Sequence, residues 1–259
     1  MIFKRKSLLI YLILFCVTGF KTSQDTKMLL IKGGEFSPFY GIQGNVKIND
    51  FYMDEHPVTQ EDFAAFLQKY PEWKKSKTKQ IFADKAYLSN WIEDDSYGTL
   101  NAQSPVNYIS WFAARKYCEC QGKRLPTTDE WEYVARASEN KEDGSKDKVF
   151  YQKILSWYEK PSPVVINDWG KFKNYWGVYD MHGLIWEWTD DFNSVMISGE
   201  SRKDAGEDNQ QFCGAGALNS KDPSDYAAYM RYALRGSLKA NYCLKNLGFR
   251  CVKTKNNEK

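Results

Sequence analysis

Residues 104–138 constrain the fold most strongly, because this short stretch carries the start and stop signals of two helices. Ser110 is placed to cap the first helix, which then ends at Gly122. Thr127 and Glu130 have the spacing of a capping box and begin the second helix. We therefore predict two short helices joined by a short loop.

Two segments near the start of the chain predict short strands. Met28–Phe36 and the alternating Asn45–Asp54 are separated by a glycine-containing turn. Thr59 then begins a helix with Asp62 in its first turn, and Pro71 ends it. The apolar residues of this helix recur at helical spacing, so we expect one face of it to lie on the core.

The remaining segments predict loops. Residues 72–104 hold a lysine run and an acidic run without periodicity, so we expect a surface insertion whose charges face solvent. Residues 139–148 predict a hydrophilic loop, and the aromatic-rich residues 149–180 show no clear helix. Residues 193–225 are too long for a passive connector, so we expect a functional or ligand-facing loop there.

The start of the chain predicts export. Residues 1–20 have a basic beginning followed by the apolar run Ser7–Phe20, which is shorter than the roughly 20 residues of a membrane-spanning helix. We therefore expect a signal peptide and a periplasmic or secreted protein. Cys16 leaves a second interpretation open, in which residues 1–20 are a lipoprotein signal and an acylated thiol anchors the chain to a membrane.

The charge of the chain excludes several classes of partner. The formal net charge is +3 and the leader supplies three positive charges, so the remainder is close to neutral. Nucleic acids and anionic membrane surfaces need a clustered excess of Lys and Arg. We expect neither as a partner, and a membrane contact only through a lipid or an uncleaved leader. Nucleotide-binding, α/β-hydrolase and zincin motifs are also absent from the sequence.

Export also determines how the cysteines are interpreted, because an oxidising compartment favours disulfides. Five cysteines follow the leader: Cys118, Cys120, Cys213, Cys243 and Cys251. At most two bridges form within one chain, so at least one thiol is free, joined to another molecule or bound to a metal.

The order of the motifs resembles that of the formylglycine-generating enzyme family, also called the sulfatase-modifying-factor domain. The matching segments are GGEF, FYMDEHPVTQEDFAAF, PVNYISWFAARKYC, GKRLPTTDEWEYVAR, GVYDMHGLIWEW and NLGFRC. The resemblance covers roughly residues 28–253 and leaves 254–259 as a charged tail. It implies a single α+β domain with a C-type-lectin-like core, little regular secondary structure and long loops.

The resemblance further implies a disulfide between Cys118 and Cys251, which would contribute about 4 kcal/mol on the chain-entropy model. Cys213 and Cys243 flank the loop that matches the active face of the family. We weigh three roles for these two: a second disulfide, a reactive free thiol, or copper ligands. Cys120 is interpreted as a structural or free thiol rather than a ligand.

Active family members oxidise a substrate cysteine with copper(I), which two cysteine thiolates four residues apart hold, because soft sulfur ligands suit copper(I). On the resemblance, these two positions fall near Asp222–Ser224 and near Ala228 or Tyr229. Neither position holds a cysteine. We therefore predict that the chain does not make formylglycine.

A second departure concerns calcium, which prefers about six to eight oxygen ligands. In the turn HGLIWEW the carboxylate of Glu187 is kept, but Leu184 stands where relatives have an Asn ligand. We keep Glu187 as a weakened calcium candidate. Trp186 and Trp188 of the same turn are predicted to line a pocket with His182, although a lone His is more often structural.

The segment that replaces the copper loop offers carboxylates and guanidinium groups that can bind a peptide or a small polar ligand. The same groups can instead form internal salt bridges. The predicted binding-loop residues are Asp222, Ser224, Asp225, Tyr229, Arg231, Arg235 and Ser237.

We therefore expect an exported, non-oxidase accessory or binding protein that acts on a protein partner. HGLIWEW, FCGAG, DPSDYAAYMRYALR and NLGFRC resemble the family branch associated with copper nitrite reductases in denitrification. That resemblance implies support of a periplasmic copper redox enzyme. The alternative is a copper- or thiol-dependent oxidase whose site has moved to Cys213 or Cys243, with His182.

Overall fold

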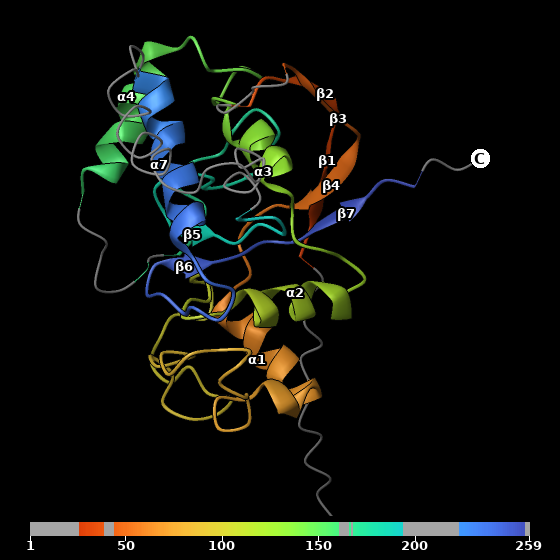
Figure 1. Cartoon of the computed structure of the whole chain (residues 1–259), viewed down its shortest axis with the longest axis vertical. Helices are drawn as coiled ribbons and strands as arrows, with labels where there is room; N and C mark the ends of the chain where they lie inside the picture. Colours follow the sequence, from red (N-terminus) through yellow and green to blue (C-terminus); the bar gives the residue numbers. More distant parts are fainter. Residues whose placement is uncertain (1–25, 39–43, 161–165, 167, 194–222, 257–259) are drawn as a thin grey trace, which may run out of the picture.

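The computed structural model describes the chain over residues 26–38, 44–160, 166, 168–193 and 223–256, and the fold of these parts is drawn in Figure 1. Within them, helices and strands are short and separated by long turns. None of the helices in these parts has the length and apolar character needed to cross a membrane.

A three-stranded antiparallel sheet joins the two ends of the domain. Its order is β1 (Met28–Ile31), β4 (Phe51–Asp54) and β7 (Val252–Thr254). Met53 in the central strand is opposite Leu29 on one side and Val252 on the other. The C-terminal strand β7 therefore pairs with β4, on the side of β4 away from β1.

Each of the two predicted strands is broken in the structure. β2 (Gly34–Phe36) pairs with β3 (Val46–Ile48) in a separate two-stranded sheet. At the break, a Cβ on Gly33 would lie 2.1 Å from the carbonyl oxygen of Ile48, so only glycine fits this crossing. The Gly33 N–H instead donates to Asp50 Oδ1 at 2.9 Å.

The three predicted helices are confirmed, with their predicted caps. They are α1 (Gln60–Lys69), α2 (Trp111–Cys120) and α3 (Thr128–Ala135). The hydroxyls of Thr59, Ser110 and Thr127 accept hydrogen bonds from the first turns of these helices. A short 3₁₀ helix, η1 (Pro71–Trp73), follows α1 at the predicted proline.

Two helices were not predicted, and they pack against each other. α4 (Lys148–Tyr158) and α7 (Pro223–Ser237) lie side by side in Figure 1. Asp147 caps α4 by accepting from the N–H groups of Val149 and Phe150. This cap, followed by the buried pair Phe150 and Ile154 four residues apart, was the signal available in the sequence.

The largest core cluster lies between α1, α2 and the C-terminal segment. Phe63 of α1 packs against Tyr117 of α2 and against Phe249, with ring centroids 5.9 and 6.3 Å apart. The Cys118–Cys251 disulfide implied by the family resemblance is present in this core, with Cα atoms 5.6 Å apart. Beside it, the short parallel strands β5 (Trp186–Glu187) and β6 (Leu247–Gly248) pair.

Residues 72–104 are more than a surface insertion. Leu88 and Trp91 are buried in the large core, and the Trp91 indole donates to Gln60 of α1 at 2.7 Å. The two charge runs also meet, because Lys74 and Asp95 form an ion pair at 2.6 Å. The prediction of a peripheral loop was therefore wrong for Leu88 and Trp91, whereas the charged side chains of Lys77, Lys79 and Glu93 are exposed as predicted.

Candidate functional site

The predicted binding loop is a helix from Pro223 onward. Tyr229, Arg231, Arg235 and Ser237 all lie on α7, and the Ser237 hydroxyl donates to the carbonyl of Leu234 at 2.7 Å. Asp222 lies outside the described residues, as do the side chains of Ser224 and Asp225. A helix presents its side chains on fixed faces, so these residues do not act together as one loop.

Arg231 and Arg235 are one helical turn apart on α7, and both are buried against Glu132 of α3. Arg231 Nη2 lies 2.7 Å from one oxygen of the Glu132 carboxylate, and Arg235 Nη1 lies 2.6 Å from the other. For the two arginines, the interpretation as internal salt bridges is therefore confirmed. We call Glu132, Arg231, Arg235, Tyr158 and His182 the buried arginine cluster.

Glu132 is ionised inside the protein. Burial by itself would raise the pKa of the carboxyl group, but the charges of Arg231 and Arg235 outweigh burial and lower this pKa to about 2. Glu132 was not among the predicted site residues. Its signal was a glutamate directly after Trp131, on the face of α3 that is buried.

His182 is held as a neutral residue behind the arginines. Its Nε2 lies 2.8 Å from the carbonyl oxygen of Ala135, and its Nδ1 lies 3.3 Å from the Tyr158 hydroxyl. Burial, and next the charge of Arg231, lowers the pKa of His182 to about 3. The imidazole thus donates through Nε2 and accepts at Nδ1, which is the geometry of a structural histidine.

Trp131 connects the buried arginine cluster to a second buried ion pair. Its ring lies 4.6 Å from the guanidinium of Arg235, and its indole N–H donates to Glu187 at 2.8 Å. Glu187 also pairs with Arg250 at 2.7 Å, and both side chains are fully buried. The two glutamates are therefore held by arginines on either side of one tryptophan.

This geometry does not favour calcium at Glu187. Arg250 bonds to both carboxylate oxygens, at 2.8 and 2.7 Å, so a cation would have to displace a guanidinium. Among the described residues, no group of three or more His, Cys, Asp or Glu side chains is arranged to hold a metal. Calcium remains an untested prediction.

The predicted pocket around the two tryptophans is wrong for Trp188. This side chain is fully buried in the large core, and its indole donates to the carbonyl of Ile109 at 2.8 Å. Trp186 is half-buried and stacks on Tyr158 with ring centroids 5.2 Å apart. A groove of about 640 Å³ lies elsewhere, beside β2 and β3, and is lined by Gly33, Gly34, Glu35, Lys47, Ile48, Asn49, Asp50, Thr254 and Lys255.

The described free thiols are Cys120, which is half-buried, and Cys243, which is buried. The Cys243 thiol donates to the carbonyl of Asn241 at 3.5 Å. Burial and the nearby charge of Asp84 raise the pKa of Cys243, so without a metal it stays protonated at neutral pH. Cys213 lies outside the described residues, and the predicted second disulfide is not supported because Cys243 is a free thiol.

The positions that the family uses for copper do not fit that metal here. On the resemblance they fall near 222–224 and near Ala228 or Tyr229, of which 223, 224, 228 and 229 lie on α7, and none is a cysteine. Copper(I) prefers thiolates over the carboxylate and hydroxyl groups that these residues offer.

Comparisons with known proteins give the same family. Residues 17–255 match the family described as "Sulfatase-modifying factor enzyme 1-like domain". The "Inactive C-alpha-formylglycine-generating enzyme 2" of Bos taurus is 27% identical over 88% of this chain and 88% of its own length. The "Formylglycine-generating enzyme" of Bos taurus is 28% identical over 91% of this chain and 77% of its own length. Identity alone therefore does not separate an active from an inactive relative.

A solved structure confirms the expected fold. The chain in "Structure of PvdO from Pseudomonas aeruginosa" has a TM-score of 0.50 and 15% identity, covering 88% of this chain and 94% of that one. At 15% identity, this similarity shows the fold alone. The fold is a single α+β domain of the C-type-lectin-like kind with long loops. With a family match that spans nearly the whole sequence, this chain belongs to the sulfatase-modifying factor enzyme 1-like domain family.

Proposed function

We propose that this chain is a non-oxidase member of its family that acts by binding a protein partner outside the cytoplasm. One observation carries the proposal: α7 contains the segment that resembles the family's copper loop, and its arginines are buried in ion pairs with Glu132. The ion pairs between α7 and Glu132 stabilise the fold. The two positions that would hold copper, near 222–224 and near 228 or 229, offer no soft ligand for it.

Two further observations support the proposal. His182 has both ring nitrogens in hydrogen bonds and a strongly lowered pKa, so it is a poor general base at neutral pH. Cys243 is buried with a raised pKa, which disfavours a thiolate nucleophile. A similar relative that is named as inactive shows that the family includes members without the oxidase reaction.

The more specific form of the proposal names the partner class as an exported copper redox enzyme such as a nitrite reductase. Its support is the motif pattern HGLIWEW, FCGAG, DPSDYAAYMRYALR and NLGFRC together with the secretory character of residues 1–20. Periplasmic or secreted location, with or without a lipid on Cys16, belongs to the same proposal.

Affinity capture tests the partner claim directly. The full chain, tagged at its C-terminus, is expressed in its own host, crosslinked and purified from the cell envelope and periplasm. We expect one redox metalloprotein to be enriched. Enrichment of none, together with turnover of a thiol substrate by the purified chain, would overturn the proposal.

The second candidate function is an oxidase with a relocated site, and the free thiol of Cys243 is the observation that favours it. A copper(I) competition titration of the purified chain, with disulfides kept intact, separates the two candidates. Tight one-to-one binding that is lost in both Cys213→Ser and Cys243→Ser would support the relocated site. The absence of such binding is what the non-oxidase proposal predicts.

A further inference from the structure

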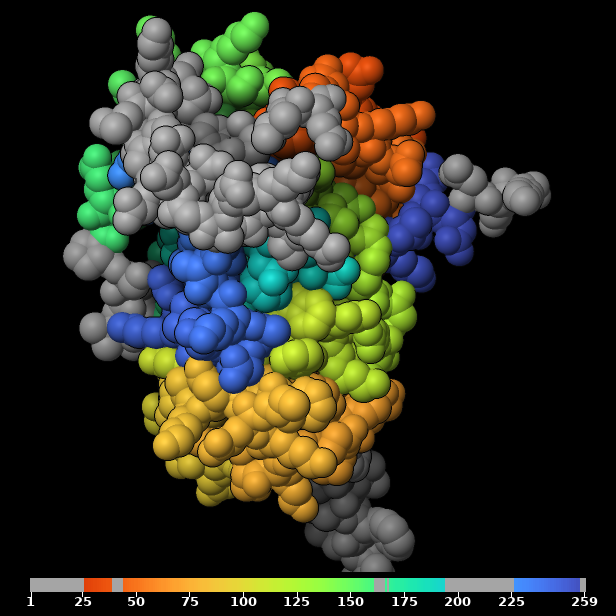
Figure 2. All heavy atoms as spheres, viewed as in Figure 1, coloured from red at the N-terminus to blue at the C-terminus, as the bar shows by residue number. Residues whose placement is uncertain are grey.

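The end of the molecule formed by α1 and residues 72–104 carries exposed apolar groups that the fold itself does not use. Figure 2 shows this end as the orange and yellow surface below the rest of the chain. Ile81 is 71% exposed and Phe82 is 39% exposed, next to each other in one turn. A lone exposed apolar residue needs no explanation, but adjacent ones on a patch do.

The turn presents these two side chains because of its hydrogen bonds. The N–H groups of Phe82 and Ala83 both donate to the carbonyl of Lys79, at 2.8 and 3.2 Å. Ala83 is buried, so the turn is anchored on its inner side while Ile81 faces outward. The Asp84 N–H donates to the carbonyl of Asn241 at 2.8 Å and fixes the turn to the C-terminal segment.

Phe82 belongs to a continuous line of rings, which we call the aromatic strip: Trp73, Phe82, Phe112 and Trp111. Consecutive ring centroids are 6.0, 5.5 and 5.3 Å apart, mostly in edge-to-face contacts. Phe82 is exposed and the other three rings are half-buried. Each ring of the strip therefore has part of its surface accessible to solvent. Rigid, half-buried aromatic rings are the groups that contribute most to protein interfaces.

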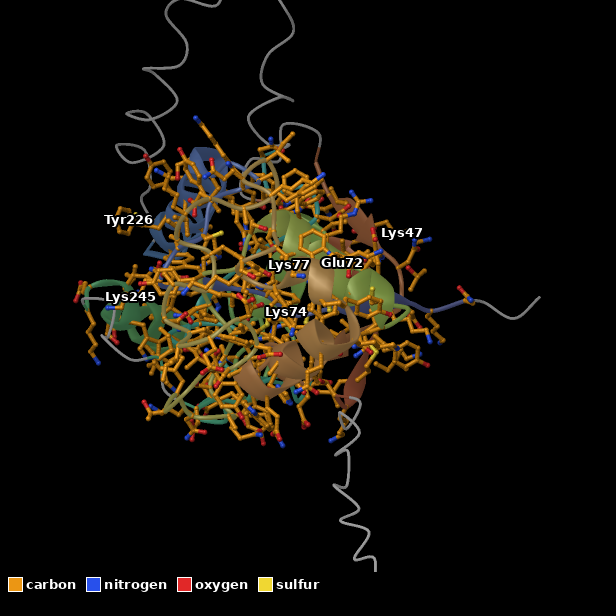
Figure 3. The ribbon with its side chains drawn as sticks, turned by 90° about the horizontal axis from the view of Figure 1, so that it is seen from below. Lys47, Glu72, Lys74, Lys77, Tyr226 and Lys245 are labelled. Carbon is orange, nitrogen blue, oxygen red and sulfur yellow. A yellow bond between two sulfur atoms is a disulfide. The ribbon has the colours of Figure 1, made fainter. Side chains whose placement is uncertain are left out.

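Exposed lysines surround the strip. Within the parts of the chain that the structure describes, these lysines form no ion pair: Lys77, Lys79, Lys85 and Lys239. Two nearby acidic groups are engaged, because Asp95 pairs with Lys74 and Asp94 accepts from the N–H of Ser76, while Glu93 is exposed. Figure 3 views this end directly and shows Lys74 and Lys77 in the middle of the face, with the exposed Glu72 beside them.

We propose that the aromatic strip and its lysines are the docking surface for an acidic segment of the partner protein, with Ile81 and Phe82 as the apolar contacts. The inference rests on the proposed function, because it names the surface through which the chain would bind its partner. The lysines would attract the acidic segment and speed association, and the rings would provide the desolvated contact. A membrane is the less favoured occupant, because residues 72–104 expose few large apolar side chains, Ile81, Phe82 and Ile92, among many charged ones.

Site-specific photo-crosslinking tests the surface. The full chain carries p-benzoylphenylalanine in place of either Phe82 or Tyr226, which are 39% and 43% exposed. Tyr226 lies on α7, well apart from Lys77 in Figure 3, so it reports on the face that matches the family's active site. We expect the Phe82 position to form an adduct with one protein in host cells, and the Tyr226 position to form none with that protein.

Charge reversal provides the matched control. The double variant Lys79→Glu, Lys85→Glu should lower the yield of the adduct at position 82 about tenfold, because two glutamates then face the acidic segment. Lys146→Glu with Lys148→Glu makes the same change in net charge at exposed lysines near the start of α4 and should leave the adduct unchanged. Unchanged circular dichroism of both variants confirms that they fold.

Several results would overturn the inference. One is an adduct with the partner from position 226 but not from position 82. Another is an adduct of position 82 with lipid. A third is an equal loss of adduct yield in the two charge-reversal variants. No adduct at Phe82, while affinity capture still enriches a redox metalloprotein, would reject this surface and leave the proposed function standing. No partner by either method would reject both.

Discussion

The buried arginine cluster and the aromatic strip use charged groups in opposite ways. In the cluster, Arg231 and Arg235 are buried and both contact Glu132. Around the strip, Lys79 and Lys85 are exposed and form no ion pair with another described residue. The face that resembles the family's catalytic face is therefore built on buried ion pairs, whereas the end that carries the aromatic strip has exposed charged side chains.

The largest expected effect comes from a substitution in the buried arginine cluster. Glu132→Gln removes the charge that both arginines share, so two guanidinium groups stay buried without a counter-ion. We expect a loss of about 3–5 kcal/mol in the free energy of unfolding, measured by urea denaturation.

The matched control is Glu119→Gln, which removes the exposed Arg115–Glu119 pair on α2 at 3.0 Å. We expect a loss below about 0.5 kcal/mol, because solvent screens an exposed pair. Equal effects of the two substitutions would show that the cluster is no more important to stability than a surface pair.

The next effect concerns the pH dependence of the cluster. His182 has a pKa of about 3 in the folded protein against an ordinary value of 6.5, so the unfolded chain binds its proton first as pH falls. Stability is therefore lost on acidification. His182→Gln should remove about 2 kcal/mol of the difference in unfolding free energy between pH 7 and pH 5. An unchanged pH profile would mean that His182 is not held neutral.

A third prediction has the opposite sign. Burial, against the charge of Lys123, raises the pKa of Asp54 to about 6 from an ordinary 3.8, so the folded protein binds this proton first. The carboxyl group adds stability as pH falls from 7 to 5. Asp54→Asn should abolish about 1 kcal/mol of that gain, measured from urea curves at the two pH values. A gain that persists in the variant would assign it to another group.

The smallest expected effect on stability comes from a substitution beside the aromatic strip. Ile81→Ser should change the free energy of unfolding by less than about 0.5 kcal/mol, because the side chain is 71% exposed. The same variant should weaken partner capture. Val149→Ser, at a side chain that is 76% exposed on α4, is the control that should leave capture unchanged. A large loss of stability in Ile81→Ser would assign the turn a structural role instead.

Local signals explain which parts of the fold were predictable. The caps at Thr59, Ser110 and Thr127 lie within three residues of the N–H groups they bond, so the helices that they begin were predicted. The break at Gly33 was not, because it results from the backbone of Ile48 and Asn49 crossing close to it. An alternating pattern of residues predicts a strand but not where another segment of backbone crosses it.

The candidate site was less predictable because its contacts are distant in sequence. Arg231 bonds to Glu132 across 99 residues, so nothing near α7 in the chain marks its arginines as buried. Without that partner, the segment was interpreted as a loop, and it stayed open whether its charged groups bind a ligand or form internal salt bridges. The disulfide was found through the family motifs, since five cysteines by themselves allow many pairings.

The most direct test of the central claim is an assay for formylglycine. The purified full chain is incubated with copper(I), oxygen and a cysteine peptide that a formylglycine-generating enzyme converts in a parallel reaction, and the peptide is followed by mass spectrometry. We expect the peptide cysteine to stay unchanged with this chain while the parallel reaction yields the aldehyde. Conversion of the cysteine to the aldehyde by this chain, lost in Cys243→Ser, would contradict it.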